Sequence, residues 1–386
     1  MKGDAGQEAG RSGLRPPLAG LWLKEGRQIA GVTAAFIGAA VFWTAIRVMG
    51  QLDDVHFKIE EGLPPPYRVR LLDWPSFFFP AFVLWLAVVQ LGGERSRGLD
   101  RLTFFLPYAR RTVFAVKAAL GAAVIAAALL LSALVGFGLV AGSPYRDVVV
   151  FGPALGLRLG TLFVDALALY ALAMLMGAIA GSGGYQVALT IIFGVYPAGV
   201  IGLLYLTAVV HVEALHLQPL VEHWAPVEWL RAHLEAHKEE ITDAVIGLSP
   251  LLHSVGAFVV GFPDPLTGGT DPAQEAAALW RLVPYDLGMT AAFLAAGAAG
   301  YAANRLELSR RMLVVPELRP LFLVGIPVHF ALLGGLVASG FGGPVTGPGA
   351  LVRFYFGAAV LGGVVYWGTR QRIFGPPRRR RGAPAG

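Results

Sequence analysis

The chain has 386 residues, of which 55% are hydrophobic and 15% are charged, and its mean hydropathy is +0.61. This composition excludes an ordinary soluble domain, because several uncharged runs approach or exceed the roughly 20 residues that a helix needs to cross a bilayer. The absence of cysteine excludes disulfides and thiolate metal sites. The net charge of +6 does not indicate nucleic-acid binding, because the basic residues flank the apolar runs, as the positive-inside rule expects. We therefore expect an integral membrane protein.

The N-terminal part of the chain is polar before it becomes apolar. Residues 1–20 are rich in Gly, Ala and Pro, which predicts a disordered tail, and they lack the apolar core of a removable signal peptide. Residues 21–29 form a short amphipathic stretch with Trp22 near its start. This pattern predicts an interfacial elbow helix ahead of the first span.

Hydropathy predicts an all-α fold, a polytopic transmembrane helix bundle of about eight spans. Residues 30–210 hold spans one to five, separated by a loop of mixed charge at 50–73 and by a basic loop at 92–117. Residues 284–369 hold spans six to eight, and residues 370–386 form a basic tail. The expected spans cover residues 30–49, 74–91, 113–141, 157–180, 185–210, 284–303, 321–341 and 350–368.

A long polar insertion, residues 211–283, separates the fifth and sixth expected spans. Its acidic residues recur along stretches that we expect to be helical, so we expect a helical extracellular insertion before span six. Within it, residues 244–260 are apolar but interrupted by Ser249 and Pro250. The stretch is too short and broken for a span, which leaves a surface-lying or a re-entrant element open.

The distribution of basic residues predicts the orientation. With eight spans and both termini cytoplasmic, 21 of the 31 Lys and Arg residues lie on the cytoplasmic side. The acidic residues are distributed the other way, and Asp165 falls in the middle of the expected span 157–180. Since the Lys and Arg bias sets topology, the N- and C-termini and loop 92–117 are expected in the cytoplasm.

Loop 92–117 is basic but also carries large apolar side chains. Leu99, Leu102 and Leu106 follow helical spacing, which predicts a short amphipathic helix ending at Pro107. An apolar patch rimmed by charge is typical of a docking surface. Simple anchoring of the loop at the membrane interface is the alternative.

Asp165 stands in an otherwise apolar span. Intramembrane carboxylates are costly and often functional. A structural role, in which Asp165 pairs with Arg158 two turns earlier or caps a neighbouring helix, is equally consistent with the sequence.

No catalytic constellation or metal site is expected. The sequence lacks the Gly-rich phosphate loop of ATP-binding proteins. His233 and His237 have the spacing of helical zinc ligands, but Glu235 lies between them rather than next to the first histidine. We interpret both histidines as solvated residues of an exterior helix, with a metal-binding or pH-sensing role as the less favoured alternative.

The spacing in loop 92–117 resembles the first cytoplasmic loop of ABC-2-type transporter permeases. The family has an acidic residue before a Gly-Thr-Leu-like step, a Leu-Pro turn with a following Arg, and a Lys that opens the third span. This chain departs from that pattern at Asp100 and at Tyr108 and Ala109. The resemblance covers roughly residues 20–310 and rests here on Glu94, Gly98, Leu99, Leu102, Leu106, Pro107, Arg110, Arg111 and Lys117.

The resemblance implies a permease subunit, not itself an enzyme, in the plasma membrane of a bacterium. Residues 94–112 would be the coupling helix that docks on a separate ABC ATP-binding subunit. This chain would hold no cofactor, with ATP and Mg²⁺ on that partner. A second permease chain, identical or paralogous, would complete the path. The docking residues implied are Glu94, Gly98, Leu99, Leu102, Phe105, Leu106, Pro107, Arg110 and Arg111.

The spans carry few charges, which is compatible with a lipophilic or amphipathic cargo and less so with a highly charged one. Export is the usual direction in the resembled family. One alternative is a multi-span membrane enzyme or sensor with its site in the insertion 211–283. Secondary transporters usually show broken spans, several buried polar groups and internal repeats, and this sequence shows little of that pattern.

Overall fold

The computed structural model describes most of the chain. The described residues are 18–72, 74, 77–151, 155–217, 219, 224–237, 240–241, 244–245, 248–252, 272–304, 311–340 and 347–374. Most of the tail predicted at 1–20, and the four arginines of the basic tail, lie outside these residues.

The described part of the chain is overwhelmingly helical. Its helices are α1 (Leu18–Glu60), α2 (Phe78–Ala87), the π-helical turn η1 (Val88–Gly92), α3 (Gly93–Arg97), α4 (Asp100–Phe104), α5 (Arg110–Ala141), α6 (Leu155–Ile179), α7 (Gly183–Ala214), α9 (Ala225–Ala236), α13 (Pro272–Ala302), the 3₁₀ turn η3 (Pro316–Leu318), α14 (Arg319–Ser339) and α15 (Pro348–Phe374). Two short parallel strands, β1 (Tyr67–Arg68) and β2 (Val149–Val150), join the loops that follow α1 and α5.

Six of these helices are long and apolar enough to cross a bilayer, namely α1, α5, α6, α7, α14 with the preceding 3₁₀ turn, and α15. The protein is therefore a multi-pass membrane protein with a helical bundle fold, as predicted. The other two expected spans, 74–91 and 284–303, are also largely helical. The first is divided between α2 and η1, and the second lies within α13 except for its last residue.

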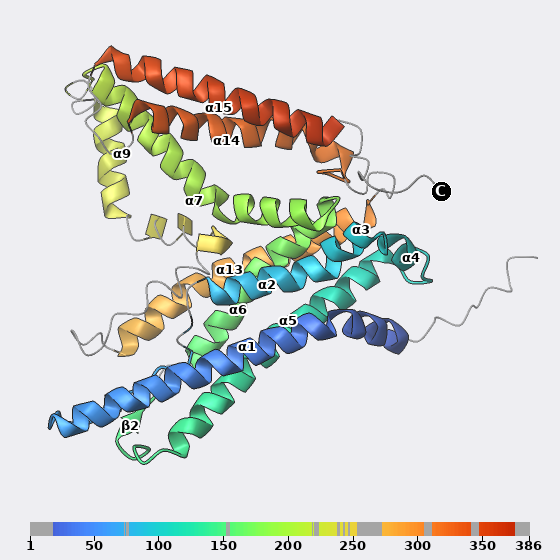
Figure 1. The fold of residues 1–386 in the computed structure, drawn as a ribbon. Helices are drawn as coiled ribbons and strands as arrows, with labels where there is room; N and C mark the ends of the chain where they lie inside the picture. Colours follow the sequence, from blue (N-terminus) through green and yellow to red (C-terminus); the bar gives the residue numbers. More distant parts are fainter. Residues whose placement is uncertain are drawn as a thin grey trace, which may run out of the picture.

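The N-terminal boundaries predicted from the sequence are wrong. The expected elbow at 21–29 is not a separate helix but the first part of α1, and α1 continues through the expected loop start to Glu60. The segment contains no proline that would end the helix. At 1.5 Å per residue, its 43 residues span about 65 Å, twice the thickness of a hydrocarbon core. The first turns of α1 are bent away from the rest (Figure 1).

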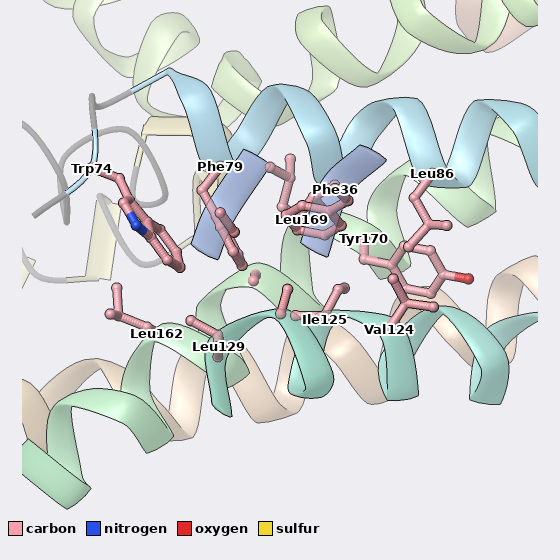
Figure 2. Close-up of a cluster of buried hydrophobic side chains, with 14 of the residues drawn as sticks. Phe36, Trp74, Phe79, Leu86, Val124, Ile125, Leu129, Leu162, Leu169 and Tyr170 are labelled. Carbon is pink, nitrogen blue, oxygen red and sulfur yellow. The ribbon is translucent and has the colours of Figure 1, made fainter. Parts of the chain in front are cut away.

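Helix α6 lies at the centre of the bundle, with 78% of its apolar stretch buried. It packs against α13, α2, α5 and α7. Figure 2 shows side chains from α1, α2, α5 and α6 meeting in one apolar core. At its centre Phe36 stacks on Phe82 and contacts Phe79, and Ile125 and Leu169 are almost fully buried beside them. This core fixes the relative positions of the helices that carry the site described below.

Helix α7 is visibly bent near its middle, and it contains Pro197 (Figure 1). Proline disturbs the helical hydrogen bonds of its turn. Ser249, from the polar insertion, compensates at this position, because its hydroxyl accepts a 2.9 Å hydrogen bond from the backbone N–H of Ala198. The side chain of Ser249 is fully buried and also donates to the Val245 carbonyl. The described part of 244–260 thus reaches the middle of α7, which favours the re-entrant interpretation.

The predicted insertion 211–283 overlaps two helices. Helix α7 extends to Ala214 and α13 begins at Pro272, so the segment that separates these helices covers residues 215–271, and the extracellular bounds of the insertion stay a prediction. The helix starts are close to expectation elsewhere, because α5, α6, α7, α14 and α15 each begin within three residues of the predicted span.

Helices α14 and α15 form an antiparallel hairpin on one flank of the bundle, next to α7 (Figure 1). The two backbones approach closely where Gly334 faces Gly357. A Cβ atom added at Gly334 would lie 2.6 Å from the carbonyl oxygen of Gly357. Small residues at this crossing therefore allow van der Waals contact between the two helices, as is common in membranes.

We predict that Gly357→Leu will destabilise the hairpin, because the new side chain must push α14 away. Overpacking of this kind costs about 1–3 kcal/mol. Thermal unfolding in detergent, followed by size-exclusion chromatography with fluorescence detection, should show a lower Tm. Gly363→Leu is the matched control, because a Cβ there meets no atom within 4 Å. Equal Tm values for the two variants would contradict the close approach.

Candidate functional site

A buried cluster of charged side chains lies where α1, α3 and α5 meet. Lys117 is fully buried in α5, and its ammonium group donates to Glu25 of α1, to Glu94 of α3 at 2.9 Å and to the backbone carbonyl of Gln90 at 3.0 Å. The two carboxylates are 1% and 3% exposed. All three protons of the ammonium group therefore have acceptors. We call Glu25, Gln90, Glu94 and Lys117 the Lys117 cluster.

One further cation lies at the rim of the cluster. Lys24 is partly exposed, and its ammonium group is 2.8 Å from Glu25 and 3.7 Å from Glu94. It also donates to the hydroxyl of Thr103 in α4. The two lysines balance the two carboxylates, which reduces the cost of removing these charges from water.

The π-helical turn η1 places Gln90 inside the cluster. Its side-chain amide donates to the carbonyl oxygen of Lys117 at 2.9 Å, and its amide oxygen accepts from the hydroxyl of Tyr170 in α6. Gly121 makes room for that ring, because a Cβ there would overlap the tyrosine side chain. The polar contacts thus continue from α5 through η1 to α6, and π-helical turns often occur at functional sites.

Arg95 ties the loop to the end of α6. Its guanidinium group is buried and donates to the carbonyl oxygens of Gly177, Ala178 and Ala180. These are the acceptors that a helix leaves unpaired at its C-terminus, where a positive charge is also favourable. Burial lowers the pKa of Arg95 to about 10, with Tyr301, Asp100 and Glu94 acting in the opposite direction. The side chain therefore remains protonated at neutral pH.

Arg110 performs the same role at the end of α13. Its guanidinium group donates to the carbonyl oxygens of Ala302 and Asn304, at 3.1 and 2.8 Å. The group also lies over the ring of Phe104, 4.4 Å from its centroid. Loop 92–117 is consequently bonded to the ends of two helices, α6 and α13, besides its contacts with α1 and α5.

The structure divides the sequence-predicted docking residues into two groups. Glu94 and Arg110 point inward, and Leu106 packs partly against the core. Gly98 has a φ of +75° and ends α3 in the left-handed conformation that glycine favours. The side chain of Leu102 lies outside the described part of the chain. The residues that face outward are Leu99, Phe105, Pro107 and Arg111.

The predicted helix over 99–106 is shorter than expected. Helix α4 covers only Asp100–Phe104, and the chain turns through the residues that follow. As a result, Leu106 leaves the line of helical spacing and reaches the core, whereas Phe105 is 84% exposed. The apolar outer face is therefore built on Phe105 and Leu99 rather than on Leu106.

Asp165 is buried in α6 and takes part in an interaction with another group. Its functional role and its pairing with Arg158 both stay predictions. Among the residues that the structure describes, no group of three or more potential metal ligands converges.

The sequence analysis did not predict that Lys117 and Glu25 form a buried ion pair. Lys117 was expected only as the residue that opens the third span, and Glu25 only as part of an elbow. The signal available was the position of Lys117, which lies about one turn inside the expected span 113–141 and not at its end. A lysine at that depth requires carboxylates nearby.

Comparison of this chain with protein-family models, curated proteins and solved structures gave no match. The site therefore has to be interpreted from its own geometry.

We predict that Lys117→Met will strongly destabilise the protein, because it leaves Glu25 and Glu94 buried without their main partner. Breaking a buried ion pair from one side costs about 3–5 kcal/mol. Thermal unfolding in detergent is the measurement. The triple variant Glu25→Gln, Glu94→Gln and Lys117→Met should recover most of the loss, because it removes the charges together.

Lys24→Met is the control for this experiment. Lys24 is 38% exposed at its side chain, so its removal should cost about 1 kcal/mol or less. A Lys117→Met protein as stable as the Lys24→Met protein would contradict the buried cluster.

Proposed function

We propose that this protein is the membrane-spanning permease subunit of an ATP-binding cassette transporter, with the outer face of loop 92–117 as the docking site for a separate ATPase subunit. The observation that carries the proposal is the rigid connection of an exposed apolar face to the bundle. Phe105 and Leu99 face outward, and the residues beside them in the chain are bonded to α1, α5, α6 and α13.

Such a connection suits mechanical coupling. A docked ATPase that moves the loop would displace four helices together, because the polar contacts hold each of them to the loop. Rigid-body movement of this kind is a common form of conformational coupling. A loop that served only to anchor the chain at the membrane interface would not need buried charges on its inner side.

The arrangement of the helices supports the proposed orientation. The start of α1, the α3–α4 segment and the end of α15 lie at one end of the bundle, and α9 lies at the other (Figure 1). Successive long helices run in alternating directions between these ends, in the order α1, α2 with α3, α5, α6, α7, α13, α14 and α15. We therefore propose eight passes, with the loop and both chain ends in the cytoplasm of a bacterial cell.

A second permease chain and a lipophilic or amphipathic cargo complete the proposal. The basis for such a cargo is the scarcity of charge along the spans. Asp165 is the one acidic residue in the apolar stretch of α6, and it is buried against neighbouring helices.

The proposal predicts that Phe105→Asp or Leu99→Asp will abolish recovery of the ATPase partner while leaving the bundle folded. Charging a central apolar contact of an interface costs about 2 kcal/mol or more, which weakens binding roughly 30-fold. The chain, tagged and extracted from its native membrane in mild detergent, should bring down an ATP-hydrolysing subunit. The variants should lose that ATPase activity in the eluate.

Phe57→Asp is the matched control. Phe57 is 60% exposed, but it lies near the far end of α1 from the loop. It should retain the partner. Wild-type protein that elutes without ATPase activity, or loop variants that retain it in full, would contradict the proposal and direct attention to the polar insertion instead.

A further inference from the structure

A second set of side chains with ligand chemistry lies at the opposite end of the bundle, at the C-terminal end of α9. His233 lies in the last turn of this helix, and His237 follows the helix directly as its C-terminal cap. Their ring centroids are 4.5 Å apart. Both side chains are exposed to solvent. Their position places them away from the Lys117 cluster and from loop 92–117.

Each imidazole ring is held by a contact of its own. The ring of His233 stacks on Trp229, with centroids 5.3 Å apart and an angle of 7° between the planes. The Nδ1 atom of His237 is 3.1 Å from a carboxylate oxygen of Glu240. A carboxylate on Nδ1 fixes the tautomer that leaves Nε2 as the free lone-pair donor, which is the usual arrangement around histidine metal ligands.

We propose that His233 and His237 chelate one divalent transition-metal cation of the zinc, copper and nickel class, with Glu240 as the outer residue that orients His237. Two nitrogen ligands on a tetrahedral ion, each about 2.0–2.1 Å from it, are about 3.3 Å apart, and rings 4.5 Å apart can reach this separation. Imidazole selects these cations over magnesium and calcium, which prefer oxygen ligands.

The site has two protein ligands and an open side. No group of three potential ligands converges within the described part of the chain, so the described residues supply these two ligands and no third. A site of this kind exchanges its ion readily and leaves positions for an additional ligand, in contrast to the closed four-ligand sites that stabilise folds. The proposal is independent of the ATPase-docking proposal, because it concerns other residues at the other end of the molecule.

The test is metal binding to the full-length chain in detergent, purified with an affinity tag that contains no histidine. Isothermal titration with Cu²⁺, Zn²⁺ and Ni²⁺ should show one saturable site, with Cu²⁺ binding most tightly. His233→Ala and His237→Ala should each weaken binding roughly tenfold or more, and Glu240→Gln should weaken it about tenfold. Mg²⁺ should not compete.

Electron paramagnetic resonance of the Cu²⁺ form gives a second readout, because couplings from two imidazole nitrogens should appear and should fall to one in either histidine variant. His56→Ala is the matched control. His56 is also exposed and also lies beside a carboxylate, that of Glu60, but its ring contacts are with Phe57 and Tyr145. Unchanged binding in the His233→Ala and His237→Ala proteins, or the absence of saturable binding, would overturn the proposal.

Discussion

A lysine ammonium group can be buried in a protein only if acceptors replace the water it loses. In this bundle Lys117 obtains them from three different segments, the carboxylate of α1, the carboxylate of α3 and the carbonyl of η1. Moving any one of these segments alone would leave a buried charge without its partner, which costs several kcal/mol. The relative positions of the first helix, the loop and α5 all depend on this requirement.

The basic residues of loop 92–117 have different roles that a count of charges does not distinguish. Arg95 and Arg110 bind the carboxyl ends of α6 and α13. Their guanidinium groups donate there to carbonyl oxygens that have no partner within the helices. Arg111 and Arg97 face solvent. The positive-inside pattern is thus partly a pattern of helix capping, and only the outward residues are available to a partner.

Much of the bundle could be predicted from the sequence, because uncharged runs of about 20 residues have few structural alternatives. The helices α5, α6 and α15 begin near the predicted positions for that reason. The continuity of α1 was missed, because amphipathic and apolar stretches read as separate elements although no proline divides them. The π-helical turn at η1 was also missed, since no local sequence pattern marks the residues Val88–Gly92 that form it.

The docking residues were predicted by type but not by direction. Helical spacing predicts Leu106 on the same face as Leu99. Because α4 ends at Phe104, Leu106 instead lies against the core and Phe105 faces solvent. Spacing alone cannot locate a helix end that is set by tertiary contacts. Glu94 was expected at a partner surface, but its carboxylate is used within the chain.

The pairing of Glu25 with Lys117 also has a consequence for how the protein is made. The two residues are 92 positions apart, so the first helix leaves the ribosome long before its partner has been synthesised. Until α5 has inserted, the carboxylate of Glu25 has only Lys24 beside it and must remain in water or among lipid headgroups. Docking of the first turns of α1 on the bundle is therefore a late step of assembly, which follows the insertion of α5 instead of preceding it.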